Sequence, residues 1–433
     1  MNIILLSGGS GKRLWPLSNE VRSKQFIKIF KQDNGEYQSM VQRIYSQIKT
    51  VDPDATVTIA TSRSQVSAIH NQLGEDVGIS VEPCRRDTFA AIALATAYLH
   101  DVQGVPEDEA VVVCPVDPYV DLDYFKCVND LCKAAREGDK NLVLMGIKPT
   151  YPSEKYGYII PSNGAYTFTE KPTKEKAEEY IKQNALWNGG VFAYKLSYVL
   201  NKSKELLGTS DYSELFGNYD KLKKISFDYA VVEAETSIDV LVYSGQWKDL
   251  GTWNTLTEAM EDPIIGNGVL NDTCENVHVV NELDIPVLAM GLKDVVISAS
   301  PDGILVSDKE QSSYIKPYVD SFDQEIMFAE KSWGSYRVLD VEESSMTVKV
   351  TLNPGNKMNY HSHEKRDEIW AVISGNGKTI VDGMEQPIKP GDVVTMTAGC
   401  KHTVIAGDSG LQLIEVQLGD SISVQDKHKY EMP

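Results

Sequence analysis

The sequence predicts an α/β fold with a mostly parallel sheet in its N-terminal part, a small β connector and an all-β barrel at its C-terminus. Three observations support this. Short apolar runs alternate with amphipathic stretches up to about residue 260, short strands punctuated by Gly, Asn and Asp follow, and strands separated by Gly-containing turns resume after Trp333. A chain of 433 residues is long enough for two or three domains. We place these domains at 1–262, 263–330 and 331–433.

Two kinds of segment alternate in the N-terminal part. The expected strands are short apolar runs at 56–60, 110–114, 141–146 and 167–170. The expected helices are amphipathic stretches at 89–100 and 124–137. This alternation predicts a Rossmann-like, mostly parallel sheet with helices on both faces. Ligands bind such sheets beyond the carboxyl ends of the strands, so we expect the functional site there.

The pattern changes in the second half of the chain. Short strands are expected at 278–280, 287–290, 295–299 and 303–306, and they form the β connector. The charged stretch 322–330 carries a few large apolar residues, and we expect it to be a helical linker. Beyond it, turns at 375–377, 382–383, 390–392 and 407–410 separate the strands, which is typical of an all-β barrel or jelly roll.

The balance of charge excludes two classes of partner. The chain has 42 Lys and Arg against 62 Asp and Glu, a formal net charge of −20. We therefore expect no nucleic acid and no membrane as a partner, because nucleic acids and anionic membranes attract positive surfaces. A small anionic substrate is compatible with this charge, since a local cluster of Arg and Lys outweighs the global field at contact distance.

The cysteines and the N-terminus indicate a compartment. The six cysteines are scattered without a Cys-x-x-Cys pair, so we expect free thiols in a reducing environment. The N-terminus lacks a basic region followed by a long apolar run, and no stretch reaches the roughly 18 apolar residues of a membrane span. We therefore expect a cytoplasmic protein.

A Gly-rich loop follows the first apolar run of the chain. Gly8, Gly9 and Gly11 allow backbone N–H groups to approach anionic oxygens, and Arg13 and Lys24 add positive charge. The loop lacks the Gly-Lys-Ser/Thr ending of a Walker loop and the strict Gly-x-Gly-x-x-Gly spacing of a dinucleotide fingerprint. The pattern therefore predicts a phosphate site of another kind.

The loop and its flanks read Leu6-Ser-Gly-Gly-Ser-Gly-Lys-Arg-Leu-Trp-Pro-Leu-Ser18, followed by Lys24-Gln25-Phe26. This resembles the signature of the sugar-1-phosphate nucleotidyltransferases, and in particular of the mannose-1-phosphate guanylyltransferases. Six further segments resemble that family's motifs in the same order, at 82–88, 114–117, 156–159, 170–172, 187–190 and 247–253. A single Asp after a strand is more often a turn or a helix cap, but seven segments in one order are not explained that way.

The resemblance implies roles for the matched residues. The residues implied in nucleotide binding are Leu6, Gly8, Gly9, Gly11, Lys12, Arg13, Glu82, Arg86 and Thr88. Those implied in sugar-phosphate binding are Tyr156, Gly157, Glu170, Lys171 and Asn188. Those implied in catalysis are Arg13, Lys24, Asp117 and Asp249, and the two carboxylates are the implied Mg²⁺ ligands. The chain departs from the family at Asp87, where Asn is usual, and at Pro118, where His is usual.

A second constellation lies in the C-terminal part. His361 and His363 are two residues apart, so on a strand both imidazoles point to the same side. Glu368 and His402 arrive from neighbouring strands and complete a site suited to Zn²⁺ or another divalent transition metal, such as Fe²⁺ or Mn²⁺. The segments around these residues resemble the two cupin motifs, so the barrel is expected to be a cupin.

A guanylyltransferase joined to a cupin resembles the bifunctional phosphomannose isomerase and GDP-mannose pyrophosphorylase family over nearly the whole chain. The resemblance implies transfer of GMP from GTP to mannose-1-phosphate, with mannose-6-phosphate isomerisation as a second activity. Where that family has Gln-Met-His-His-His-Arg-Ala-Glu-His-Trp, this chain has His361 at the Gln and loses three histidines, at Glu364, Lys365 and Ile369. Lys349, Lys365 and Arg366 remain as cations for a phosphate.

Two alternatives stay open. The first is a guanylyltransferase for another sugar-1-phosphate, such as a manno-heptose-1-phosphate, or a transferase for another nucleotide, with a structural or regulatory cupin. The second is a non-catalytic sensor of nucleotide sugars, and the retention of Asp117, Asp249 and Lys24 argues against it. The resemblance also permits a homodimer and suggests a role in polysaccharide biosynthesis.

Overall fold

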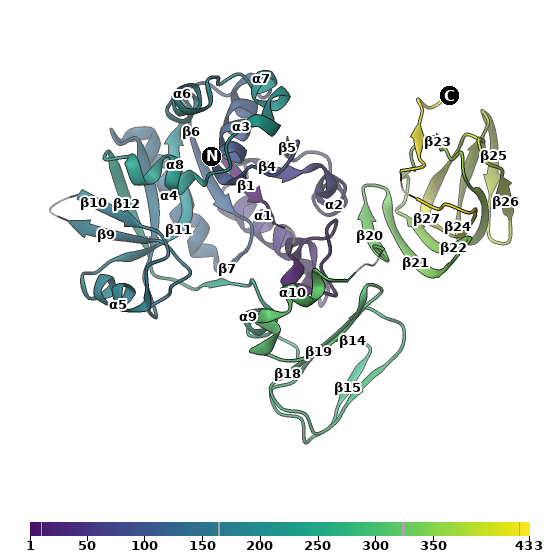
Figure 1. Ribbon diagram of the computed structural model, residues 1–433. Coiled ribbons are helices and arrows are strands. Elements are labelled where there is room, and N and C mark those ends of the chain that lie inside the picture. The colour runs from purple at the N-terminus through teal and green to yellow at the C-terminus, as the bar shows by residue number, and fades with distance from the viewer. Residues whose placement is uncertain (10, 163–164, 323–324, 424) are drawn as a thin grey trace. The chain divides into compact units, whose positions relative to one another are not determined.

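The computed structural model describes residues 1–9, 11–162, 165–322, 325–423 and 425–433 (Figure 1). The chain forms two compact units. The first consists of Met1–Ser10, Ser23–Val66 and Leu73–Glu261, and the second of Gly11–Arg22, Ser67–Gln72 and Asp262–Pro433. Among the helices of the described chain, none combines the length and apolar character needed to cross a membrane.

The first unit is built around a nine-stranded sheet whose main path runs β10-β9-β11-β6-β1-β4-β5, with β8 pairing β11 and β12. The strands are β1 Asn2–Ser7, β4 Thr56–Ser62, β5 Gly78–Glu82, β6 Ala110–Pro115, β8 Leu142–Ile147, β9 Tyr158–Ser162, β10 Ala165–Thr169, β11 Leu186–Lys195 and β12 Ile238–Tyr243. The central strands β6, β1, β4 and β5 are parallel, whereas β11 is antiparallel to β6 and β8. The antiparallel strands make the sheet mixed.

Helices and two small ribbons complete the first unit. The helices are α1 Met40–Val51, α3 Asp87–Asp101, α4 Leu122–Glu137, α5 Lys174–Lys182, α6 Leu196–Leu207, α7 Tyr212–Gly217, α8 Phe227–Ala230 and α9 Trp253–Thr257. Helix α2 Val66–Leu73 lies mostly in the segment Ser67–Gln72 of the second unit. The ribbons pair β2 Lys28–Lys31 with β3 Tyr37–Ser39, and β7 Pro118–Val120 with β13 Trp247–Asp249. The predicted strands and helices of this unit are all confirmed, with ends shifted by a few residues.

Helix α3 lies in an apolar core of the first unit. Its alanines at 90, 91, 93, 95 and 97 are almost fully buried, and their small side chains let the helix backbone approach the sheet. Ile4 of β1 and Val111 and Val113 of β6 belong to the same core. Burial of β1 and β6 in this core therefore fixes the positions of the Gly-rich loop after β1 and of Asp117 after β6.

The connector is a short stack of mostly parallel strands in the second unit. One sheet has the order β14-β16-β18-β19, and a second ribbon pairs β15 with β17. The strands are β14 Ile264–Gly266, β15 Gly268–Leu270, β16 His278–Asn281, β17 Val287–Ala289, β18 Val295–Ser300 and β19 Gly303–Asp308. Gly266 has φ +86°, and a Cβ there would lie 1.9 Å from the Asn281 carbonyl oxygen, so only glycine fits. The four strands predicted here are confirmed.

The helical linker expected over 322–330 is wrong. Helix α10 spans Lys316–Val319 and so ends before this stretch, and strand β20 spans Phe328–Lys331. Residues 323 and 324 lie outside the described chain. Strand β20 pairs antiparallel with β21 Gly334–Glu342, with Phe328 opposite Arg337. A stretch of nine residues is too short for a helix to be stable by itself, so pairing with the barrel decides its conformation.

The C-terminal strands form one curled antiparallel sheet of nine strands (Figure 1). After β20 and β21 they are β22 Ser345–Leu352, β23 His361–Ser362, β24 Asp367–Val381, β25 Met384–Ile388, β26 Val393–Met396, β27 His402–Leu418 and β28 His428–Lys429. The long strands β24 and β27 pair along most of their length. Trp370, Val404 and Leu413 are buried in its apolar interior, as expected for the predicted barrel.

Candidate active and metal sites

A cavity of about 550 Å³ lies at the carboxyl ends of the parallel strands of the first unit. Its walls come from the end of β1, the turn after β4, the segment after β5 and the end of β6. The predicted site residues that line it are Leu6, Gly8, Gly9, Glu82, Arg86, Thr88 and Asp117. The sheet thus brings together at one edge residues that are spread over more than 100 positions of the sequence.

The remaining predicted residues of the Gly-rich loop belong to the segment Gly11–Arg22, which groups with the second unit. Within that unit the Lys12 ammonium lies 3.0 Å from the Asp320 carboxylate and 3.7 Å from that of Glu20. These pairs raise the pKa of Lys12, with the hydrogen bond to Asp320 as the largest cause. Ser10 of the signature lies outside the described residues.

A buried glutamine that sequence reasoning missed holds the start of the loop. Gln65 is 1% exposed, and its Nε2 donates to Ser23 Oγ at 2.7 Å and to the Gly9 carbonyl at 3.4 Å. Ser23 Oγ also donates to the Gly9 carbonyl, at 2.9 Å. Gln65 Oε1 accepts from Ser7 Oγ at 3.2 Å. Gln65 therefore fixes the loop backbone, and no local pattern in the sequence marks it for that role.

The second predicted nucleotide motif forms another wall of the cavity. Glu82 accepts a hydrogen bond from the Tyr219 hydroxyl at 2.8 Å, and burial raises the pKa of this carboxyl despite that bond. Arg86 Nη2 donates to the Asp220 carbonyl. Thr88 Oγ1 accepts from the backbone N–H of Phe227 at 2.8 Å. Residues 219–227 thus hold this motif in place.

Three of the predicted catalytic residues meet at the end of β6. The Lys24 ammonium lies 2.9 Å from Asp117 Oδ2 and 3.7 Å from Asp249 Oδ1. The pairing of β7 with β13 sets Pro118 opposite Asp249, which brings the second carboxylate to the first. Burial by itself lowers the pKa of Lys24, but the two carboxylates outweigh it and the pKa is raised. Both carboxylates are about half exposed, at 41% and 45%, and carboxylate oxygens are ligands that Mg²⁺ prefers.

The predicted sugar-phosphate residues gather around β11. The backbone N–H of Asn188 donates to the Gly157 carbonyl at 2.8 Å. A Cβ at Gly157 would lie 2.5 Å from Glu170 Oε2, so glycine there lets the carboxylate approach. Glu170 pairs with Lys171 at 2.6 Å, and Lys171 has a strained φ of +45°.

Asp228 on α8 was missed by the sequence analysis. It accepts a hydrogen bond from Asn188 Nδ2 at 2.7 Å, so it fixes the orientation of the predicted sugar-reading amide. Burial and then the nearby charge of Glu170 raise the pKa of Asp228 to about 6. Tyr156, in contrast, lies in an aromatic cluster, with its ring centroid 5.0 Å from Trp187 and 5.2 Å from Trp247.

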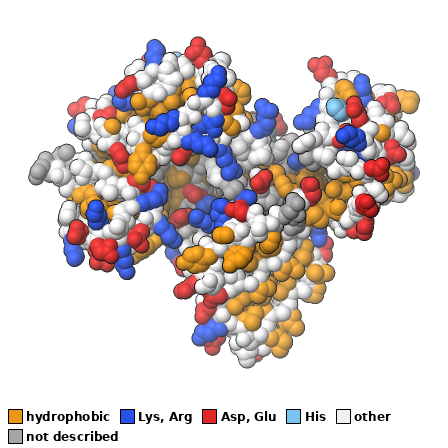
Figure 2. Space-filling view, in the orientation of Figure 1, with side chains coloured by type: hydrophobic (Ala, Val, Ile, Leu, Met, Phe, Trp, Pro, Cys, Tyr) orange, Lys and Arg blue, Asp and Glu red, His pale blue; other side chains and the backbone are white. Residues whose placement is uncertain are grey.

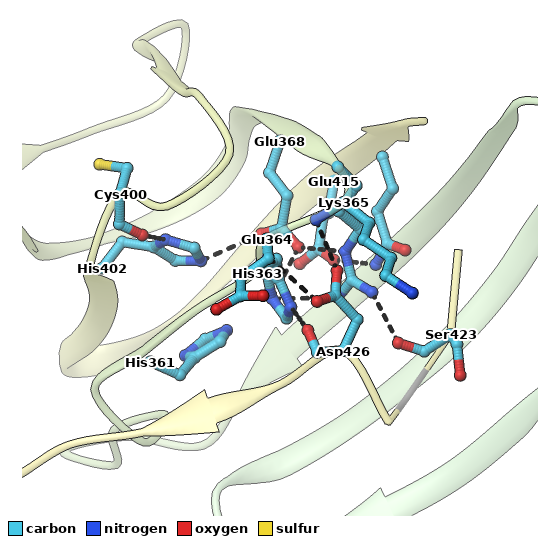
Figure 3. A network of polar contacts seen from close by, with 12 residues as sticks. His361, His363, Glu364, Lys365, Glu368, Cys400, His402, Glu415, Ser423 and Asp426 are labelled. Atoms are coloured by element: carbon cyan, nitrogen blue, oxygen red, sulfur yellow. Dashed lines mark hydrogen bonds and ion pairs between the residues drawn. The ribbon is translucent and has the colours of Figure 1, made fainter. Parts of the chain in front are cut away.

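The four predicted cupin ligands converge inside the C-terminal sheet (Figure 3). His361 on β23, Glu368 on β24 and His363 after β23 meet His402 at the start of β27, and each offers one ligand atom within 4.8 Å of the others. All four side chains are 2% exposed. The register explains the meeting, because His361 lies directly opposite His402.

The imidazoles are oriented by backbone carbonyls. His402 Nδ1 lies 3.0 Å from the Cys400 oxygen, and His363 Nδ1 contacts the Asp426 oxygen (Figure 3). His361 Nδ1 lies 2.6 Å from the Asn359 oxygen. A carbonyl only accepts, so each Nδ1 carries the proton and each Nε2 presents its lone pair to the cluster.

Two orphaned atoms show that the cluster fits a cation. Glu368 Oε2 and His402 Nε2 lie 3.2 Å apart, and neither has a hydrogen-bond partner in the part of the chain that the structure describes. Buried polar atoms of this kind are normally satisfied. Three imidazole nitrogens and one carboxylate form a donor set that suits Zn²⁺ and similar divalent transition metals.

Further charged groups surround this cluster, and among them the sequence analysis gave a role only to Arg366, as a cation for a phosphate. Arg366 is 8% exposed, and its Nε donates to Glu368 Oε1 at 3.0 Å while its Nη2 contacts His363 Nε2 at 3.0 Å. Glu415 on β27 is also buried, and burial followed by the charge of Glu368 raises its pKa. Burial lowers the pKa of Lys427 to about 8. The interior therefore holds two titratable groups, Glu415 and Lys427, that the sequence analysis did not identify.

Two family models match separate parts of the chain. The family model described as nucleotidyl transferase matches residues 2–264, and the model described as mannose-6-phosphate isomerase C-terminal matches residues 322–432. A putative mannose-1-phosphate guanylyltransferase from Vibrio cholerae is 29% identical, with 99% of each chain covered. The xanthan biosynthesis protein XanB from Xanthomonas campestris is 28% identical, covering 99% of this chain and 97% of that protein.

A solved structure resembles this chain in fold. The protein titled mannose-1-phosphate geranyltransferase from Thermus thermophilus is 28% identical with a TM-score of 0.61, covering 74% of this chain and 98% of that one. The nucleotidyl transferase match spans more than half of the present chain. It contains the strands of the nine-stranded sheet, the Gly-rich loop and the ion pairs of Lys24 with Asp117 and Asp249. The chain therefore belongs to the nucleotidyl transferase family.

Proposed function

We propose that this protein transfers GMP from GTP to mannose-1-phosphate, giving GDP-mannose and pyrophosphate. The observation that carries the proposal is the pairing of Lys24 with Asp117 and Asp249 beside the Gly-rich cavity. The names of the relatives support the choice of substrates. A phosphate oxygen of mannose-1-phosphate attacks the α-phosphorus of GTP, the bond between the α- and β-phosphates breaks, and pyrophosphate leaves, so no covalent nucleophile is needed.

The charged residues have distinct roles in this proposal. Asp117 and Asp249 would hold a Mg²⁺ ion, which when bound neutralises charge on the phosphates. Lys24 and Arg13 supply positive charge to the oxygens whose charge grows during transfer. For the nucleotide we propose contacts from Leu6, Gly8, Gly9, Gly11 and Lys12 on the phosphate side and from Glu82, Arg86 and Thr88 on the base side.

The choice of guanine is supported by Glu82. Its carboxylate, held by Tyr219, is a hydrogen-bond acceptor on the cavity wall. Guanine offers two neighbouring N–H donors on its Watson–Crick edge, whereas adenine has an acceptor at the middle of that edge. We therefore propose that the carboxylate favours guanine over adenine. For the sugar phosphate we propose contacts from Tyr156, Gly157, Glu170, Lys171 and Asn188.

A second activity is proposed for the cupin, the isomerisation of mannose-6-phosphate. The observation that favours it is the buried cluster of His361, His363, Glu368 and His402, which would hold Zn²⁺ or another divalent transition metal. When bound, such an ion polarises a sugar carbonyl. Glu415 and Arg366, buried beside the cluster, are candidates for moving a proton and binding the phosphate.

One experiment distinguishes the proposed activity from a transferase with other substrates and from a non-catalytic sensor. Pyrophosphate release is measured with GTP and other nucleoside triphosphates, each combined with mannose-1-phosphate, a manno-heptose-1-phosphate and other sugar-1-phosphates. We expect the highest kcat/KM with GTP and mannose-1-phosphate. Preference for the heptose or another nucleotide replaces the substrate in the proposal, and binding without turnover for every pair means a sensor.

A homodimer in the cytoplasm completes the proposal. The connector exposes apolar side chains, which gather over it in Figure 2 and include Val269, Leu288, Met290, Ile304 and Val306. Its strand β19 pairs only with β18 among the described strands, so one edge is open for a second copy. We expect light scattering to give twice the chain mass, and Ile304→Glu with Val306→Glu to give the single mass.

A further inference from the structure

The second half of the Gly-rich loop is bound by the connector through a partly buried ion pair. Arg22 Nη1 lies 2.8 Å from Glu282 Oε2, and Arg22 Nη2 lies 2.9 Å from Glu282 Oε1. Arg22 is 6% exposed, and its guanidinium also lies 5.2 Å from the centroid of the Phe328 ring. Glu282 follows β16 and Phe328 begins β20, so one side chain joins the loop to two later elements of the same unit.

Asn19 adds a second attachment. Its Oδ1 accepts from the backbone N–H groups of Val21 at 2.9 Å and Arg22 at 2.7 Å, which fixes the turn that carries Arg22. Its Nδ2 donates to Asp302 Oδ2 at 2.8 Å and to the Phe328 carbonyl at 3.1 Å. The turn is thereby tied to the connector and to the first strand of the C-terminal sheet.

The middle of the loop is held in the same way. Ser300 Oγ donates to the Pro16 carbonyl at 2.7 Å. The Trp15 ring lies 5.1 Å from that of Phe322, and a Cβ at Gly303 would lie 2.4 Å from Trp15, so Gly303 leaves room for the indole. The residues just after Arg13 are therefore fixed by the connector.

The other end of the loop is fixed in the first unit. Ser23, which directly follows Arg22, is fully buried and donates to the Gly9 carbonyl at 2.9 Å. The next residue is Lys24, whose ammonium pairs with Asp117 at 2.9 Å. Arg13 thus lies on a loop anchored at both ends, and Arg22 and Ser23 are the two anchors directly before the proposed catalytic lysine.

We propose that Arg22 is a positioning residue for nucleotidyl transfer. With Glu282 it holds residues 11–22 in the conformation on which the action of Arg13 and Lys24 depends. This inference rests on the proposed transferase function. It makes the connector, and β20 with it, a working part of the transferase and not a spacer between two enzymes.

The variants separate positioning from simple stabilisation. Arg22→Lys keeps the positive charge but cannot form two parallel hydrogen bonds with one carboxylate. Glu282→Gln keeps the shape of the partner and removes its charge. The matched control is Asp284→Asn, because Asp284 is two residues away, is 94% exposed and pairs with Arg337 only at the surface, at 3.2 Å.

Kinetics of the full chain are measured at a temperature where calorimetry shows every variant folded. We expect Arg22→Lys and Glu282→Gln each to lower kcat by roughly 10- to 100-fold, with a smaller change in the KM for GTP, because misplaced groups act mainly on the transition state. The double variant is expected to lose no more than the worse single variant, since the two residues act as a pair. An unchanged kcat in the folded variants, with only a lower Tm, overturns the proposal.

A readout without turnover keeps this test apart from that of the proposed function. Backbone hydrogen exchange over residues 11–22 is compared in wild type, Arg22→Lys and Asp284→Asn without substrates. We expect faster exchange, by about tenfold or more, in Arg22→Lys alone. If wild type releases no pyrophosphate with any substrate pair, the proposed function fails. If exchange over 11–22 is unchanged, the positioning role of Arg22 fails, whatever the activity.

Discussion

The Lys24 ammonium lies 2.9 Å from an oxygen of the Asp117 carboxylate. Lys24 comes from the end of the Gly-rich loop and Asp117 from the end of β6, and the ribbon of β7 and β13 adds Asp249 at 3.7 Å from the same ammonium. One cation therefore sits between two like charges. Removing any of the three changes the electrostatic environment of the other two.

Asp117→Asn is expected to lower kcat by roughly 10²-fold or more, because it removes a charged metal ligand. The Asp117 side chain is 41% exposed and lies outside the apolar core, so the Tm should stay near that of wild type. Pyrophosphate release and calorimetry measure the two effects. Asp123→Asn, at a surface carboxylate that is 71% exposed, serves as the control. A variant with near-normal kcat would show that Asp117 holds no catalytic metal.

Lys24→Met should lower kcat more than it raises the KM for mannose-1-phosphate, by about 10²-fold in kcat, since the ammonium acts on charge that grows in the transition state. It should also lower the Mg²⁺ concentration needed for half-maximal rate, because no internal cation then competes for the two carboxylates. Initial rates at varied mannose-1-phosphate concentration measure kcat and KM, and initial rates at varied Mg²⁺ concentration measure the half-maximal Mg²⁺ concentration. Lys28→Met, at an exposed lysine of β2, is the control. A change confined to KM contradicts the assigned role.

Asp228 makes the stability of the first unit depend on pH. Its pKa is about 6 in the fold, whereas an Asp in an unfolded chain titrates near pH 4, at about 3.9. Between these values the folded state binds more protons, so this group destabilises the fold progressively as pH rises from 4 to 6 and by a constant amount above that. The shift corresponds to a cost on the order of 3 kcal/mol.

Asp228→Asn removes that titration. We therefore expect the Tm of wild type minus that of the variant to fall as pH rises from about 4 to 7, and then to level off. Scanning calorimetry at several pH values follows this difference for the transferase transition. Asp130→Asn, at a surface carboxylate that is 64% exposed, should show no such trend. A difference that is constant with pH would contradict the assigned pKa.

Metal analysis tests the cupin cluster. Purified protein should contain about one transition metal ion per chain, and the double variant His361→Ala with His363→Ala should contain none, because two ligands are too few for tight binding. Chelation should lower the Tm of the C-terminal transition in wild type but not in the double variant. His428→Ala, at an exposed histidine of β28, should keep its metal. Metal retained by the double variant would place the ion elsewhere.

Local sequence patterns predicted the elements that bury continuous apolar runs. The run 110–114 becomes β6, and the two-residue spacing of His361 and His363 predicted that both imidazoles reach one cluster, although β23 ends at Ser362 and His363 follows it. Local patterns failed where contacts between distant residues decide the secondary structure. At 322–330, strand β20 pairs with β21 in place of the expected helix.

The same limit applies to the sites. Gln65, Asp228 and Arg22 each form hydrogen bonds with a partner that is far away in the sequence. Their residue types are common on protein surfaces, so only their burial and their partners reveal them. Motif residues such as Lys24 and Asp117 were predictable because they stand in recognisable segments of the chain.

The attachment of Arg22 to Glu282 has a consequence for engineering this protein. A chimera joined at residue 262, with its N-terminal part taken from a relative, would bring a foreign loop against a connector shaped for Arg22, Asn19 and Trp15. Such a hybrid would keep every transferase motif and still lose the contacts that hold them. The segment to exchange as one piece therefore extends from residue 1 through the end of β20 at Lys331.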